Sequence, residues 1–213
     1  VKDSTSSAGL PSIAHYIRKI FLVSDNDAYN RLYEFLGQQP MNETLRNKGY
    51  PNTRIIHRFV KLSPEQNRHT NPIRFVEGGR TIYEQPPAYS HLNIDTSKRI
   101  YIGDRYLDSN EKMVDKPMDF TLKNCFPLEY LQKMLQSVIF PESVPEKQRF
   151  KLTEEDRQFV LKYMSQLPSE TKLPAYDTSE FFDSYTKFYF FRDGKSRIPP
   201  YIRVFNKAGW SYG

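Results

Sequence analysis

The chain has 213 residues, of which 38% are hydrophobic, 15% aromatic and 26% charged, a composition typical of a folded globular protein and not of a disordered tail. No apolar run approaches the ~18 residues of a membrane-spanning helix, so the sequence predicts no membrane span. The net charge of +6 is dispersed among acidic residues and indicates a mixed-charge surface. That charge is the only support for an anion-binding or nucleic-acid-binding protein, and we expect no nucleic-acid partner.

The first predicted elements are two amphipathic helices. Apolar residues at helical spacing predict helices over 12–23 and 28–36, the second ending at Gly37. Ser24 and Asp27, in the connection between them, have the spacing of a capping box. Residues 38–100 are punctuated by proline and glycine, so we expect them to be rich in loops.

The second half of the sequence alternates helical and strand patterns. It predicts a short strand at 100–102 and helices over 126–140 and 153–167, the last opened by a Thr153–Asp156 capping box. Two later segments have strand patterns, 187–191 and 202–205, with Asp193-Gly194 as a hairpin turn between them. Helices in the middle and strands near the end indicate an α+β fold, and no boundary signal divides the chain into independent domains.

Two short motifs lie far apart, Ser24-Asp25-Asn26 and Lys207-Ala208-Gly209. Each alone has an ordinary explanation, helix capping for the first and a strand end with a turn for the second. Between them lie Thr53-Arg54, Pro64-Glu65-Gln66-Asn67 and Pro117-Met118-Asp119-Phe120-Thr121. In this order the segments resemble the penicillin-recognising serine hydrolases, the class A β-lactamases and penicillin-binding proteins, over about residues 12–213 with an insertion near 75–115.

The resemblance implies a serine β-lactamase/transpeptidase-like fold, present here as one partial domain over 1–213. Residues 12–186 would form its helical and loop region, and 187–213 the strands that lead into the Lys-Ala-Gly motif. The implied activity is attack by a serine on a β-lactam or related amide or peptide bond, through an acyl-enzyme and without a cofactor. The implied substrates, β-lactams or cell-wall peptides, lie in the bacterial periplasm or cell envelope.

The resemblance also assigns roles to residues. As catalytic residues, Ser24 would relay a proton to the leaving nitrogen and Lys207 would present a positive charge to Ser24 and to the substrate carboxylate. As substrate-binding residues, Asn26 would bind the substrate amide, and Gly209 would leave room beside the strand. The Trp210 N–H would be half of an oxyanion hole, and Asn67 would lie in the family's Ω-loop near the deacylating water.

Three departures from the family pattern qualify these roles. The nucleophile motif Ser-x-x-Lys is absent from residues 1–23, and its later matches at Ser109, Ser169 and Ser184 lie in the wrong order, as chance matches would. We therefore expect the chain to be a fragment that is inactive alone. Alignment of Pro64 and Asn67 with the family puts Ser63 in the place of the deacylating glutamate, and Glu65, two residues away, is the alternative; Ser63 at that place would favour slow deacylation. Ala208 replaces a Thr or Ser whose hydroxyl would add about 1–2 kcal/mol of binding.

An alternative of a different class remains open. Ser63 and Ala208 also favour a non-catalytic module on the same fold that binds cell-wall peptides or glycans. The four histidines lack metal-ligand spacing, and the single cysteine, Cys125, cannot build a cysteine-based zinc site, so no metal is predicted. An unpaired strand edge near the C-terminus would favour self-association.

Overall fold

The computed structural model describes residues 2–108, 110–191 and 198–209. These residues form two compact units. The first contains residues 2–32, 135–144, 149–191 and 198–209, and the second contains 33–134 and 145–148. Two helices, α2 (Asn26–Leu36) and α4 (Leu128–Ile139), have residues in both units.

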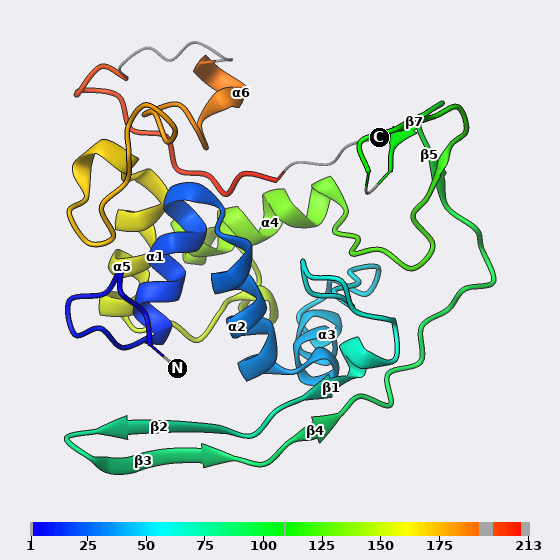
Figure 1. Cartoon of the computed structure of the whole chain (residues 1–213), viewed down its shortest axis with the longest axis horizontal. Helices are drawn as coiled ribbons and strands as arrows, with labels where there is room; N and C mark the ends of the chain where they lie inside the picture. The colour runs from blue at the N-terminus through cyan, green and yellow to red at the C-terminus, as the bar shows by residue number, and fades with distance from the viewer. Residues whose placement is uncertain (1, 109, 192–197, 210–213) are drawn as a thin grey trace. The chain divides into compact units, whose positions relative to one another are not determined.

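The first unit is built on helices α1 (Ile13–Val23) and α5 (Glu154–Ser165), which pack against each other (Figure 1). The apolar stripes of these amphipathic helices explain the packing, because Leu22 of α1 and Met164 of α5 are both buried. The remaining elements of this unit are short: η2 (Pro141–Ser143), η4 (Pro168–Glu170) and α6 (Phe188–Phe191).

The second unit combines α3 (Gln38–Asn47) with two short 3-10 turns, η1 (Gln66–Arg68) and η3 (Glu146–Gln148), and four two-stranded antiparallel sheets. The sheets pair β1 (His69–Thr70) with β4 (Ala88–Tyr89), β2 (Ile73–Glu77) with β3 (Arg80–Gln85), β5 (Tyr101–Ile102) with β8 (Met118–Asp119), and β6 (Tyr106–Leu107) with β7 (Met113–Val114).

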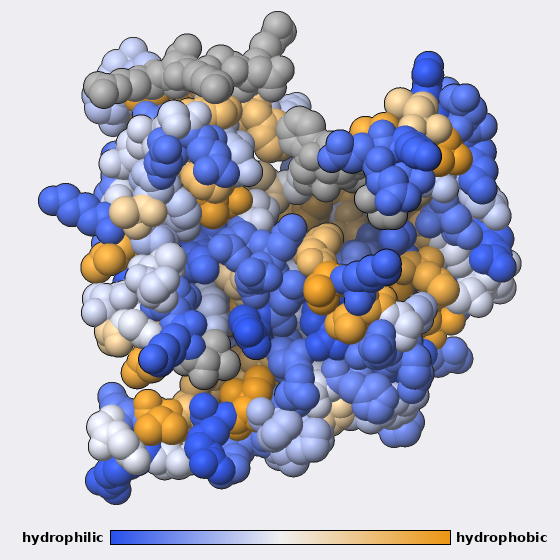
Figure 2. Space-filling model, in the orientation of Figure 1, coloured by the Kyte–Doolittle hydropathy of each residue, from blue (hydrophilic) through white to orange (hydrophobic). Residues whose placement is uncertain are grey.

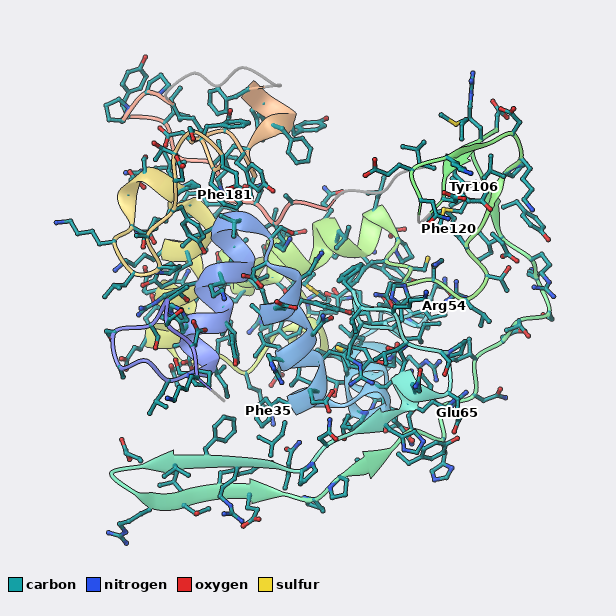
Figure 3. The ribbon with its side chains drawn as sticks, viewed as in Figure 1. Phe35, Arg54, Glu65, Tyr106, Phe120 and Phe181 are labelled. Carbon is teal, nitrogen blue, oxygen red and sulfur yellow. The ribbon has the colours of Figure 1, made fainter. Side chains whose placement is uncertain are left out.

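Aromatic and arginine contacts hold these small sheets to the rest of the second unit. Phe35, near the end of α2, lies edge-on to Phe75 of β2, with ring centroids 5.2 Å apart (Figure 3). Arg54 donates from Nη2 to the Phe120 carbonyl at 3.1 Å, and its backbone forms an isolated bridge with Cys125 (Figure 3). Such contacts are needed because a lone two-stranded hairpin is marginally stable in water.

Several predicted elements are confirmed. The helices predicted over 12–23, 28–36, 126–140 and 153–167 appear as α1, α2, α4 and α5, and the Thr153–Asp156 capping box is present. The strand predicted at 100–102 is β5, and Gly37, with φ 75°, ends α2. Helices with small antiparallel sheets fit the predicted α+β class.

Other predictions are wrong. Residues 188–191 form helix α6 and not a strand, because a short apolar run carries no period that separates the two. Residues 202–205 form no strand, since no other strand of the described residues lies beside them to share backbone hydrogen bonds. Within the expected loops of 38–100, α3 and the β2–β3 hairpin are regular. The predicted Asp193-Gly194 turn lies outside the described residues.

The surface is of mixed character. Figure 2 shows hydrophilic residues over most of the face that it displays, with apolar residues in small separate areas. Among the described residues, none of the helices combines the length and the apolar character that a bilayer crossing requires.

Candidate active site

Ser24 lies at the junction of α1 and α2 in an uncommon backbone conformation. Its φ of 56° and ψ of 42° are left-handed, and its N–H donates to the Ile20 carbonyl at 3.1 Å, which ends α1. A residue with a Cβ pays about 1–2 kcal/mol for this conformation, so it persists only where the surroundings require it. The predicted capping box of Ser24 and Asp27 is wrong, because Asp25 Oδ1 is the group that accepts the Ala28 N–H, at 2.8 Å. The Ser24 side chain is thereby left for another contact.

That contact is with Lys207. Lys207 Nζ donates to Ser24 Oγ at 2.7 Å, across 183 positions of sequence within the first unit. The same ammonium also donates to the Ala208 carbonyl. Lys207 is exposed, and partial desolvation by the neighbouring protein atoms lowers its pKa to about 8.

A second lysine, Lys187, lies beside the same segment and is only 1% exposed. Its Nζ donates to the Met164 carbonyl at 2.5 Å and to Asn206 Oδ1 at 2.6 Å. Asn206 returns a hydrogen bond from Nδ2 to the Thr186 carbonyl at 2.7 Å. Burial, and then the positive charge of Lys207, lower the pKa of Lys187 to about 8.

The other residues assigned by the resemblance are less constrained. Asn26 is the first residue of α2 and is exposed. Gly209 is exposed, and a Cβ placed on it would meet no atom within 4 Å, so no contact with the described residues requires a glycine there. Trp210 lies outside the described residues.

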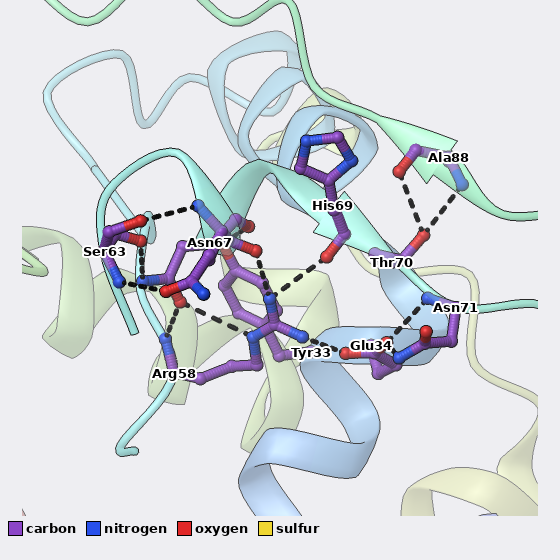
Figure 4. A network of polar contacts seen from close by, with 10 residues as sticks. Tyr33, Glu34, Arg58, Ser63, Asn67, His69, Thr70, Asn71 and Ala88 are labelled. Atoms are coloured by element: carbon purple, nitrogen blue, oxygen red, sulfur yellow. Dashed lines mark hydrogen bonds and ion pairs between the residues drawn. The ribbon is translucent and has the colours of Figure 1, made fainter. Parts of the chain in front are cut away.

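Asn67 belongs to the segment Pro64–Asn67 of the second unit, which we call the Ω-like loop. Asn67 is 2% exposed, and both the oxygen and the nitrogen of its side-chain amide form hydrogen bonds (Figure 4). Its Oδ1 accepts the Arg58 N–H at 2.9 Å, and its Nδ2 donates to the Ser63 carbonyl at 3.0 Å. Its own carbonyl accepts the Tyr33 hydroxyl at 3.1 Å. The side-chain amide of Asn67 therefore braces the loop.

Arg58 is the centre of this network (Figure 4). Its guanidinium pairs with Glu34 and donates to the carbonyls of Gln66 at 2.7 Å and His69 at 3.0 Å. Glu34 also accepts the Asn71 N–H at 2.7 Å. A buried arginine is stable here because a carboxylate compensates its charge and carbonyls satisfy its remaining donors.

Ser63, which the resemblance puts in the place of the deacylating glutamate, has a structural contact. Its Oγ accepts the Gln66 N–H at 3.1 Å, and its own N–H donates to Gln66 Oε1 at 2.8 Å, which is the reciprocal pattern of a capping box around η1. Glu65 is exposed, and its Oε1 lies 3.5 Å from His69 Nε2.

The Ser-x-x-Lys matches among the described residues differ in exposure: Ser169 is exposed, whereas Ser184 is buried. Ser109 lies outside them. Ser169 donates from its hydroxyl to Asp183, and Ser184 is 0% exposed. A serine without exposed surface cannot reach a substrate in this conformation.

Beside the Ω-like loop is an open groove of about 770 Å³ with a basic lining. Lys61 and Lys123 line it, together with Arg99, which pairs with Asp119 at 3.4 Å. The groove belongs to the second unit and includes Arg58 and Asn67 in its wall.

Sequence reasoning missed two residues that organise these clusters, Arg58 and Lys187. Arg58 gave no signal beyond its position before the Pro64–Asn67 segment. Lys187 belongs to the Ser-x-x-Lys match that begins at Ser184. Its burial depends on contacts with Met164 and Asn206, which no local sequence pattern predicts.

A comparison with known protein families addresses the resemblance directly. Residues 3–86 match the family model of the beta-lactamase enzyme family. The match covers less than half of the chain; it includes Ser24, Asn26 and the Ω-like loop, and it ends well before Lys207. It supports a β-lactamase-like hydrolase character for this part of the chain. No curated protein and no solved structure shows significant similarity to the sequence.

Proposed function

We propose that this chain carries the Ser24–Lys207 part of the active site of a β-lactamase-type serine hydrolase. The observation that carries the proposal is the 2.7 Å hydrogen bond between Lys207 Nζ and Ser24 Oγ. Ser24 belongs to the segment that matches the family, and Lys207 belongs to the motif that the sequence pattern pairs with it. The substrates proposed are β-lactams or related amides and peptides with a free carboxylate, and their location in the bacterial envelope follows from the same resemblance.

The chemistry follows from the donors and acceptors of the pair. Lys207 donates to the Ser24 oxygen, so the serine proton remains free to point toward a leaving nitrogen. The hydroxyl can therefore pass its proton to that nitrogen and take another from the Lys207 ammonium. The same ammonium, charged below about pH 8, would attract the substrate carboxylate. Asn26, exposed at the start of α2, would bind the substrate amide, and Gly209 would leave space for the substrate beside Lys207.

The acylated serine is not assigned to a residue of this chain. We expect the chain as given to bind a penicillin reversibly and to form no covalent adduct, because residues 1–23 contain no Ser-x-x-Lys motif and Ser184 is buried.

The test is the affinity of the chain for benzylpenicillin, measured by ligand-observed NMR, with intact mass to detect acylation. Lys207→Met should weaken binding about tenfold or more, because a charge-assisted hydrogen bond contributes about 1.5–3 kcal/mol. Lys151→Met, at an exposed lysine of the same unit, is the matched control and should leave affinity unchanged. Equal affinity in wild type and Lys207→Met would reject the proposal. Binding of a cell-wall muropeptide that is insensitive to Lys207→Met would favour the non-catalytic binding module.

A further inference from the structure

Lys187 is a buried cation with no carboxylate partner among the residues that the structure describes. Lysine is almost never fully buried unless it is paired, since removal of an ammonium from water is costly. Lys187 is 1% exposed, and no carboxylate of the described residues lies within ion-pair distance of it. Two neutral oxygens, the Met164 carbonyl and Asn206 Oδ1, accept its hydrogen bonds. Within the described part of the chain, hydrogen bonds to neutral groups are therefore what holds this ammonium.

The hydrogen bonds show what the charge holds. A lysine can only donate, so Lys187 fixes the Asn206 amide with its oxygen facing Nζ, and the amide nitrogen is then directed to the Thr186 carbonyl. Both ends of the Asn206 side chain are thus bound by the turn that contains residues 186–187. Asn206 is the residue immediately before Lys207.

This side-chain anchor replaces a strand ladder. Among the described residues, 203–209 make no backbone hydrogen bonds that would fix their path. The side-chain contacts that hold the segment are the Arg203–Glu170 pair at 2.7 Å, the Asn206 amide, and the Lys207–Ser24 bond. The position of the Lys207 ammonium against Ser24 therefore depends on its neighbour, Asn206.

We propose that Lys187 is a positioning and specificity-determining residue, which holds Lys207 against Ser24 through Asn206 and whose buried charge makes this site select anionic ligands over neutral ones. The proposal rests on the proposed function, because it concerns the same Ser24–Lys207 site. The two ammonium groups act on each other, since the charge of Lys207 contributes to the low pKa of Lys187. A bound carboxylate would be attracted by both charges and would relieve their mutual repulsion, whereas a neutral ligand would do neither.

The experiment compares benzylpenicillin with its neutral methyl ester. For wild-type chain we expect the acid to bind more tightly than the ester, and we expect its affinity to fall as Lys207 loses its proton above about pH 8. Lys187→Met removes the buried charge and leaves an unbranched side chain of similar length. It should weaken acid binding about tenfold and leave ester binding within about twofold. It should also move the midpoint of the pH profile upward, because the repulsion between the two ammonium groups, which lowers the pKa of Lys187, acts on both lysines and is removed in this variant.

Two further variants separate charge from position. Asn206→Ala keeps the Lys187 charge but removes the link, so acid affinity should fall without an upward shift of the pH midpoint. Lys187→Arg keeps the charge and should retain at least part of the preference for the acid, and it also serves if Lys187→Met does not fold. Circular dichroism establishes folding for each variant.

The outcomes distinguish this inference from the proposed function. If Lys207→Met weakens acid binding but folded Lys187→Met and Asn206→Ala bind acid and ester as wild type does, Lys187 has no such role and the proposed function stands. A decrease in both affinities by the same factor, with the pH midpoint unmoved, would also overturn the inference, since it indicates a general structural effect. If Lys207→Met itself changes nothing, the proposed function fails and the inference fails with it.

Discussion

The two polar clusters of this protein differ in how far the protein satisfies its own polar groups. In the second unit, the guanidinium of Arg58 is buried against a carboxylate and two carbonyls, and both ends of the Asn67 amide are bonded within the loop. In the first unit, the exposed Lys207 donates to Ser24 and to the Ala208 carbonyl, and a lysine ammonium has three donors. The Arg58–Asn67 arrangement is closed and stabilises a loop, whereas the Lys207 ammonium donates only two hydrogen bonds to the residues that the structure describes. Burial and hydrogen-bond saturation thus separate a structural cluster from the cluster that we propose as a site, although both contain residue types typical of active sites.

The largest expected effect comes from breaking the closed cluster. Arg58→Met leaves Glu34 without its partner in a partly buried position, and removal of one member of a buried pair costs about 3–5 kcal/mol. The measurement is the free energy of unfolding in urea. Arg74→Met is the control, because the Arg74–Glu84 pair on the hairpin is exposed and should contribute about 0–1 kcal/mol. Similar losses in both variants would contradict the difference in burial on which the comparison rests.

A smaller loss is expected at Asn67. Asn67→Ala removes the acceptor of the buried Arg58 N–H and the donor to Ser63, and each unsatisfied group costs about 1–3 kcal/mol. Urea unfolding again measures the change. Asn52→Ala is the matched control and should change the free energy of unfolding by about 0.5 kcal/mol or less, since the hydrogen bond from Asn52 Nδ2 to the Tyr130 hydroxyl is exposed and 3.3 Å long. If Asn67→Ala instead keeps full stability, its amide is not a brace and a substrate-facing role regains support.

The Ser24–Lys207 cluster should respond to pH, whereas the Arg58–Asn67 cluster should not. The pKa of Lys207 is lowered to about 8, so above that pH the ammonium loses its charge and its attraction for a carboxylate. Benzylpenicillin affinity should be constant from about pH 6 to 7 and then fall by up to about tenfold per pH unit above pH 8, as the charged fraction of Lys207 does. Isothermal titration across this range measures it. An affinity that is flat up to pH 10 would show that the carboxylate is not bound by this lysine.

The smallest expected effect is at the backbone of Ser24. Its left-handed conformation is costly for any residue with a Cβ and free of that cost for glycine. Ser24→Gly should therefore be about 1 kcal/mol more stable than Ser24→Ala, while both lose the hydroxyl and bind benzylpenicillin more weakly than wild type. Thermal unfolding of the pair provides the comparison. Equal stability of the two variants would mean that the junction relaxes away from φ 56° in solution.

Local elements were predictable because their signals are local. Thr153 and Asp156, three residues apart, predict the start of α5, and Gly37 predicts the end of α2. The aromatic run at 188–191 misled, because four apolar residues fit a strand as well as a helix. Asp25 and Ser24 are both good capping residues, and only the backbone conformation at the junction decided that Asp25 caps α2.

The sequence by itself determined the amphipathic helices, the α+β class and the two motifs that carry the resemblance to the β-lactamase enzyme family. The sequence identified Ser24 and Lys207 as candidates from residue type and order, but it did not predict that Lys207 Nζ and Ser24 Oγ lie 2.7 Å apart. Only the tertiary structure decided that Asn67 is a buried brace, that Arg58 and Lys187 are buried, and that Lys207 keeps its ammonium against Ser24. The physical reason is that burial and the saturation of hydrogen bonds depend on contacts between residues far apart in sequence, such as Lys187 with Met164, and periodicity and capping motifs report only on neighbours along the chain.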